Sequence, residues 1–145
     1  MSEDMEFYFD HFIEAQDAVL ETVLEELRSG KKQTHWMWFI FPQLTALGRS
    51  STAKYFGING LVEAQAYLDN KILRERLVSC LDALLKNKGQ SAELILGSID
   101  AQKLKSCITL FLMVSSDRRL NKLLNSAKLN FYQGSICIKT KEILE

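Results

Sequence analysis

Proline, glycine and cysteine are scarce in this sequence. Its 145 residues include one proline, seven glycines and three cysteines. So little proline and glycine leaves no room for long linkers, and the length is typical of one domain, so we expect a single domain over residues 1–145. The cysteines Cys80, Cys107 and Cys137 are odd in number, far apart and form no C-x-x-C pair. We therefore predict free thiols in a reducing cytosol, without disulfides.

An excess of one charge and long apolar runs are also missing. Eighteen basic side chains balance eighteen acidic ones, which argues against general nucleic-acid binding because that requires a net basic surface. No stretch approaches the roughly 20 apolar residues of a membrane-spanning helix. The N-terminus is acidic and lacks a long apolar run, so we expect no signal peptide and no membrane association. We predict a cytoplasmic protein, and the composition leaves its oligomeric state open.

Motifs of familiar catalytic sites do not occur. The two histidines, His11 and His35, have no clustered carboxylates or cysteines at metal-ligand spacing, so no metal site is predicted. There is no G-x-S-x-G elbow, P-loop or dinucleotide fingerprint, and we expect no cofactor. Cys107 lies in an apolar run, where packing is expected rather than nucleophilic attack. Because no nucleophile is identifiable, the sequence leaves open whether the protein is an enzyme.

The apolar residues are spaced as in helices. This spacing predicts an all-α fold, a compact bundle of about six to eight short and medium helices. Residues 7–29 form either two helices or one continuous helix, and Gly30 suits its end. The glutamates of this segment, Glu25 and Glu26 among them, are expected on the solvent side. The clearest amphipathic helix covers residues 73–85, where leucines share one face.

The second half of the chain contains two segments of ambiguous structure. Residues 107–114 are apolar at nearly every position, so a buried strand would give the same pattern as a core helix. We prefer the helix, because Ser98 or Asp100 can cap it, and Asp117 can open the next one. The tail over residues 129–139 is a possible short C-terminal hairpin, split by a Gln-Gly pair. A loop followed by a terminal helical turn is the alternative.

An irregular, aromatic-rich segment over residues 31–51 is the most unusual part of the chain. It holds both tryptophans and the only proline, and four of the seven residues from His35 to Phe41 are aromatic. Large aromatic side chains dominate protein cores, so core packing is expected for most of them. Alternatively, one indole lines a pocket or stacks on a ligand. Thr34 could cap a helical turn that must end before Pro42.

Polar residues around this segment could form a binding site if the loop folds back on itself. His35, Arg49 and Ser50 would supply charge-assisted donors and backbone N–H groups, which suit phosphate. Lys103 and Thr109 share a helix face, and could complete the pocket or bond to the backbone of the aromatic segment. In the structural alternative His35 bonds locally and Arg49 pairs with a surface glutamate. The candidate binding residues are His35, Trp36, Trp38, Gln43, Arg49, Ser50, Lys103 and Thr109.

The run from His35 to Gln43, HWMWFIFPQ, followed by LGRS at residues 47–50, resembles the signature of an uncharacterised bacterial family. That family is a domain of unknown function (number eighteen-ten), and some of its members carry a calpastatin label. The resemblance covers nearly the whole chain and implies a small all-α fold with no established activity. Where the family tends to have prolines in its tail, this chain has Ile136 and Ile138.

Two functions from different classes are compatible with these residues. The first is a pocket around residues 35–51 for a small anionic, phosphate- or nucleotide-like molecule. Arg49 with Ser50 would hold the anion, a tryptophan would form the wall, and His35 would transfer a proton or donate a hydrogen bond. The second is a non-enzymatic protein-interaction module, in which the aromatic motif is purely structural and an exposed face such as the basic stripe over residues 118–128 contacts the partner.

Overall fold

The computed structural model describes residues 7–145, and every regular element in that range is helical. The acidic residues at positions 3, 4 and 6 lie outside it. The elements are α1 (Asp10–Ser29), α2 (Met37–Ile40), η1 (Thr45–Leu47), α3 (Ser51–Tyr55), α4 (Leu61–Asp69), α5 (Lys71–Leu84), η2 (Leu85–Asn87), α6 (Ala92–Leu96), α7 (Ser98–Leu112), α8 (Arg118–Tyr132) and α9 (Ile138–Leu144). The predicted all-α class is confirmed. The nine α-helices of residues 7–145 exceed the expected six to eight, because several turns of four or five residues form separate helices.

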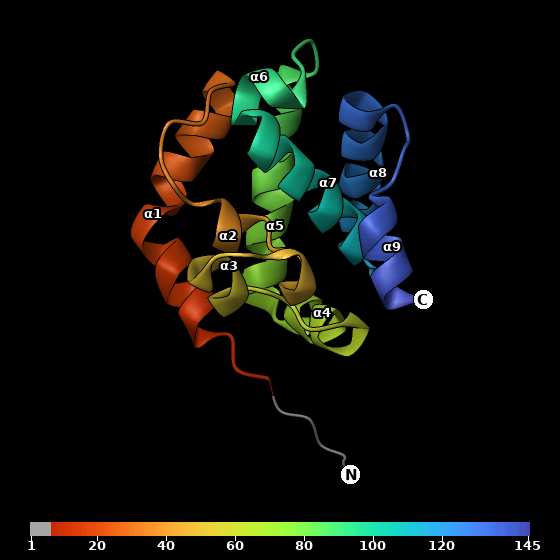
Figure 1. Cartoon of the computed structure of the whole chain (residues 1–145). Coiled ribbons are helices and arrows are strands. Elements are labelled where there is room, and N and C mark those ends of the chain that lie inside the picture. Colours follow the sequence, from red (N-terminus) through yellow and green to blue (C-terminus); the bar gives the residue numbers. More distant parts are fainter. Residues whose placement is uncertain (1–6) are drawn as a thin grey trace.

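The helix α5 runs through the middle of the molecule, with α1 on one side and α8 on the other (Figure 1). Its leucines Leu73, Leu77, Leu81 and Leu84 are buried, as their spacing on one helical face predicts. The helix α7 contacts α4, α6, α8 and α9. The short elements α2, η1 and α3 connect α1 to α4, and α2 and α3 lie between α1 and α5 in this view.

Residues 10–29 form one continuous helix, as one of the two alternatives predicted. The helix ends at Gly30, whose φ of 76° is left-handed and whose N–H bonds to the carbonyls of Glu26 and Leu27. A Cβ at this position would also lie 2.7 Å from the Gln90 side chain. Glycine therefore permits both the turn and the close approach that direct the chain into the aromatic-rich segment.

Residues 107–114 belong to the end of α7 and the turn after it, so the helix is confirmed over the buried strand. Nearly every position is apolar because four other helices surround α7 and cover it on several sides. The predicted cap was wrong: α7 begins at Ser98, its N-cap residue is Gly97, and no side chain caps it. Asp117 does cap α8, since its carboxylate accepts the Leu120 N–H at 2.8 Å.

The prediction of a possible C-terminal hairpin was wrong, because α8 continues to Tyr132 and the chain then forms α9. The Gln-Gly pair that resembled a hairpin turn instead ends the helix, with Gln133 and Gly134 in left-handed conformations at φ 54° and 82°. The hydroxyl of Tyr132 donates to the carbonyl of Ala101 in α7. This contact between helices fixes the end of α8, and no pattern within the tail itself reveals it.

The segment after the aromatic motif is closed by an isolated parallel bridge between Leu44 and Ile58. The Thr45 N–H donates to the carbonyl of Ile58 at 2.8 Å, and the Ile58 N–H donates to that of Gln43 at 2.9 Å. Glycine is required at position 57, where a Cβ would lie 2.6 Å from the Cα of Thr45. The bridge places the loop between η1 and α3 at the surface, close to α7.

Candidate functional site

The aromatic motif is mainly a core element. Trp36 is fully buried at 0% exposure, and Met37, Ile40 and Phe41 are buried beside it. Phe41 lies 6.3 Å from Trp36 between ring centroids. The structure therefore places Trp36 in the interior, with no face available to a ligand.

The carboxylate of Glu26 holds this motif in place. It accepts hydrogen bonds from the backbone N–H groups of Gln33 (2.7 Å) and Thr34 (3.1 Å), the Thr34 hydroxyl (2.7 Å) and the Trp36 indole N–H (3.0 Å). Glu26 is only 8% exposed, so the expectation that it faces solvent was wrong. Thr34 likewise bonds to Glu26 and caps no helix, because α2 starts after Trp36 without a side-chain cap.

The environment of Glu26 lowers its pKa. Burial alone raises the pKa, because it disfavours the charged carboxylate, but the four hydrogen bonds from Gln33, Thr34 and Trp36 favour that charge more strongly. The net result is a pKa of about 2, against an ordinary value of 4.5. Glu26 is therefore a charged, hydrogen-bonded anchor at neutral pH.

Because of this low pKa, the free energy of unfolding depends on pH between 4.5 and about 2. Between pH 4.5 and about 2 the unfolded chain binds more protons at Glu26 than the folded protein does. Its stabilisation is fully present above pH 4.5 and is lost as the pH falls towards 2. From pH 6 to pH 3 we expect the wild type to lose about 2 kcal/mol more than Glu26→Gln, measured by urea unfolding. Equal losses in both proteins would contradict the assignment.

Gln16 anchors the other side of the motif. It is buried, and its side-chain N–H groups lie 2.7 Å from the carbonyl oxygen of Phe39 and 3.4 Å from the Tyr67 hydroxyl. Arg76 of α5 donates to the Gln16 side-chain oxygen at 3.4 Å. These bonds join α1, α2 and α5, so Gln16 has a structural role.

His35 lies at the surface, whereas Trp38 packs against the edge of the core. His35 is exposed and forms no hydrogen bond with any residue of 7–145. Trp38 is half-buried, and the Lys103 Nζ lies 5.6 Å from the centroid of its ring. A cation at this distance over an indole is attracted to its face. Neither residue lines a cavity with Arg49.

A cavity of about 790 Å³ lies where the 43–53 segment, the first half of α7 and residues 136–139 meet. Four of the predicted candidates line it: Gln43, Arg49, Ser50 and Lys103. The volume lies within the range of about 300 to 1,000 Å³ that is typical of small-molecule sites. The structure thus brings together four of the eight predicted residues, and His35, Trp36, Trp38 and Thr109 do not line this cavity.

The charged side chains that line this cavity are all basic. Arg49, Lys103, Lys105 and Lys139 line it, and none of its lining residues is acidic. Lys103 is partly neutralised by Asp100 at 3.7 Å, a carboxylate that also pairs with Lys32 at 3.0 Å. Within residues 7–145, Arg49 and Lys139 form no ion pair with any acidic side chain.

Thr109 and Ser106 fasten the C-terminal segment to α7. The Thr109 hydroxyl donates to the carbonyl of Lys105 at 2.8 Å and accepts the N–H of Cys137 at 2.9 Å. The Ser106 hydroxyl lies 3.3 Å from the Cys137 sulfur. Thr109 therefore bonds to a backbone group outside its own helix, as one alternative predicted. That group is the N–H of Cys137, however, and not part of the aromatic segment.

Ser50 caps α3, since its hydroxyl accepts the Ala53 N–H at 3.1 Å. Among the lining residues that sequence reasoning missed are Ile99, Lys105, Ile138 and Lys139. Lysines and isolated isoleucines of this kind occur throughout protein surfaces, and no local pattern distinguishes them. Only the packing of the tail against α7 places them together.

Cys137 differs from the other two cysteines. Burial raises its pKa, but hydrogen bonds from Ser106, Thr140 and Lys139 outweigh burial and leave it below the ordinary value. Burial raises the pKa of Cys80 to about 12, and raises that of Cys107 further. We expect Ellman's reagent at pH 7.5 to modify one thiol of the native protein, and Cys137→Ser to abolish that reaction. Rapid modification of more than one thiol in the folded wild type would contradict this.

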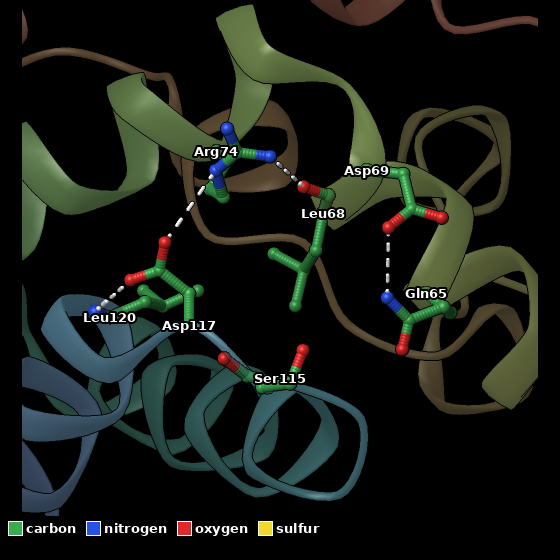
Figure 2. Close-up of a pocket in the computed structure, with 8 residues that line it drawn as sticks. Gln65, Leu68, Asp69, Arg74, Ser115, Asp117 and Leu120 are labelled. Atoms are coloured by element: carbon green, nitrogen blue, oxygen red, sulfur yellow. Dashed lines mark hydrogen bonds and ion pairs between the residues drawn. The ribbon is translucent and has the colours of Figure 1, made fainter.

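A second cavity, of about 200 Å³, lies between α4, α5 and the start of α8. Figure 2 shows Arg74 directed towards the Leu68 carbonyl and Asp117. Arg74 donates to that carbonyl at 2.9 Å and lies 3.8 Å from the Asp117 carboxylate, which also caps α8. Because these polar groups already join helices, the larger cationic cavity is the better candidate site.

The fold and the cavity describe a small all-α protein with a cationic, partly apolar hollow. The chain belongs to the family described as "Protein of unknown function (DUF1810)", whose profile matches residues 6–144. It is similar to the crystal structure of the conserved hypothetical protein Rv1873 from Mycobacterium tuberculosis. The two share 40% sequence identity and superpose with a TM-score of 0.89, over 94% of this chain and 95% of the other. Comparison with curated proteins finds no match. No helix in residues 7–145 combines the length and apolar character needed to cross a bilayer.

Proposed function

We propose that the cavity between the 43–53 segment, α7 and residues 136–139 binds a small anionic molecule. The observation that supports this most strongly is the group of four basic residues in its lining, Arg49, Lys103, Lys105 and Lys139, with no acidic residue among them. Like charges brought together at one hollow repel one another, so a bound anion would stabilise the arrangement.

The donors suit a phosphate or carboxylate group. An arginine guanidinium presents two parallel N–H donors to such a group, and lysine adds a flexible point charge. Arg49 and Lys139 have no acidic partner within residues 7–145 and are the principal contacts in this proposal. Gln43 and Gln102 add neutral donors to the same lining. Phosphate- and nucleotide-like molecules are both within this class.

The proposal concerns binding and assigns no chemical step. His35 lies outside the cavity, Trp36 is buried, and Thr109 is bonded to Lys105 and Cys137. No residue of the cavity forms a nucleophile–base pair of the kind that hydrolases and transferases use. The aromatic motif then serves to position the 43–53 segment against α7.

A thermal-shift screen with inorganic phosphate, methyl phosphate, glucose 6-phosphate and AMP tests the proposal, followed by calorimetry on each ligand that stabilises the protein. We expect Arg49→Ala to weaken binding about tenfold to 100-fold, because it removes a charge-assisted contact. Its melting temperature without ligand should not change, since Arg49 is exposed. Arg118→Ala, which removes another exposed arginine that lies outside the cavity, is the matched control. No stabilisation by any anion, or equal affinity in wild type and Arg49→Ala, would refute the proposal.

The second candidate function is a protein-interaction module that uses the basic stripe. A groove of about 680 Å³ between α5 and α8 is lined by Lys86, Lys88, Arg119 and Lys122. Two of these charges are already paired, since Arg119 contacts Glu75 at 2.6 and 2.8 Å and Lys86 lies 4.0 Å from Asp82. The groove is therefore less available to an acidic partner than the cavity is to an anion.

A further inference from the structure

The cavity has an apolar side as well as a charged one. Ile99 is 71% exposed and Ile138 is 67% exposed, and both line the cavity. Leu47 and Ile136 contribute two more aliphatic side chains to the lining. Exposed isoleucines beside a hollow offer apolar area that a ligand can remove from water.

No aromatic residue belongs to the lining of this cavity. Nucleotide bases are commonly recognised by stacking on aromatic or guanidinium planes, which contributes about 1 to 3 kcal/mol per base. Trp36 is fully buried and Trp38 lies outside the lining, behind Lys103. The apolar part of the lining is therefore aliphatic, and the single guanidinium, that of Arg49, is the contact of the anionic group. Such a lining favours a flexible hydrocarbon chain over a nucleobase.

We propose that the ligand of this site is an organic anion with an aliphatic chain, such as an alkyl phosphate or alkyl carboxylate. This inference rests on the proposed anion-binding function and narrows its ligand class. The anionic group contacts Arg49 and Lys139, and the chain lies against Ile99, Ile136 and Ile138.

The position of the anionic group follows from a neighbouring hollow. A cavity of about 310 Å³ shares Leu47, Arg49 and Lys139 with the larger one. Its lining also includes Glu142, which repels an anion. The negative group is therefore held at the boundary between the two hollows, and the chain extends into the larger cavity, where no acidic residue lies.

Calorimetric titration of the full-length protein with methyl, butyl and hexyl phosphate, and with AMP, tests this inference. We expect affinity to rise roughly three- to fourfold per methylene group that becomes buried. AMP should bind no more tightly than methyl phosphate. All ligands are used below the concentration at which hexyl phosphate forms micelles.

Three variants separate the two sides of the site. The double change Ile99→Ser and Ile138→Ser should flatten the dependence on chain length, because it weakens hexyl phosphate binding much more than methyl phosphate binding. Lys139→Gln should weaken every phosphate by the same factor. Leu94→Ser is the matched control, because Leu94 is 72% exposed in α6 and lies outside the cavity.

The outcomes distinguish this inference from the proposed function. Equal affinity for all three alkyl phosphates would overturn the aliphatic ligand class and leave anion binding standing. Tighter binding of AMP than of hexyl phosphate would have the same result. A dependence on chain length that survives the double change would also overturn the inference, since it would show the chain bound elsewhere. If no phosphate binds, the proposed function fails as well.

Discussion

Glu26→Ala is expected to lower the free energy of unfolding by about 3 to 5 kcal/mol, a large fraction of the stability of a domain of this size. The change removes the acceptor for four hydrogen bonds. It leaves the buried indole N–H of Trp36 without a partner, and it removes the acceptor of the partly buried backbone N–H groups of Gln33 and Thr34. Each unsatisfied buried donor costs about 1 to 3 kcal/mol.

Urea unfolding followed by tryptophan fluorescence measures this effect, because Trp36 itself reports on the site. Glu25→Ala is the matched control: it removes a glutamate from the same helix, one residue away, but from an exposed position. We expect that control to change stability by less than about 0.5 kcal/mol. Similar small losses in both variants would mean that Glu26 does not organise the aromatic motif.

Trp36→Ala is expected to cost about 3 to 5 kcal/mol, whereas His35→Ala should cost less than about 0.5 kcal/mol. The two residues are adjacent in the chain, but Trp36 is completely buried and His35 is exposed. Removing the indole leaves a cavity beside Phe41. It also removes one of the four hydrogen bonds that the Glu26 carboxylate accepts.

Thermal and urea unfolding of both variants measure the difference. A loss above roughly 2 kcal/mol for His35→Ala would show that its imidazole has a buried hydrogen-bond partner. A loss below about 1 kcal/mol for Trp36→Ala would show that the motif contributes little to the core, and would reopen the possibility that its indole faces a ligand.

The helices and several of their caps could be predicted because the signals are local. Asp117, Ser91 and Ser50 each precede a helix and accept an N–H three residues later, as small polar residues in that position commonly do. The leucine face of α5 likewise follows from spacing alone.

The role of Glu26 could not be predicted in the same way. Its partners lie seven to ten residues later, in an irregular loop. Helical periodicity assigns a glutamate to the solvent side when its neighbours are charged, and it carries no information on where loop N–H groups point. The hairpin prediction for the tail was wrong for a related reason, because a Gln-Gly pair suits both a hairpin turn and a helix end.

The candidate site was predicted in part. Gln43 is the last residue of the motif, and Arg49 and Ser50 follow it closely in sequence. The bridge between Leu44 and Ile58 holds that loop against α7, where Lys103 lies. The other lining residues come partly from α7 and partly from residues 136–139 of the tail, which the hairpin expectation placed incorrectly. The long aromatic signature thus indicates mainly the core of the fold, and the shorter LGRS run lies at the cavity.

The most direct test of anion binding at this cavity is an NMR titration of the full-length protein with methyl phosphate. We predict that the backbone amide signals of residues 47–50, 102–106 and 136–139 shift together with one dissociation constant, and that Arg49→Ala weakens the response. Signals that shift around residues 35–38 or 118–128 instead, or no shift at tens of millimolar ligand, would contradict the account.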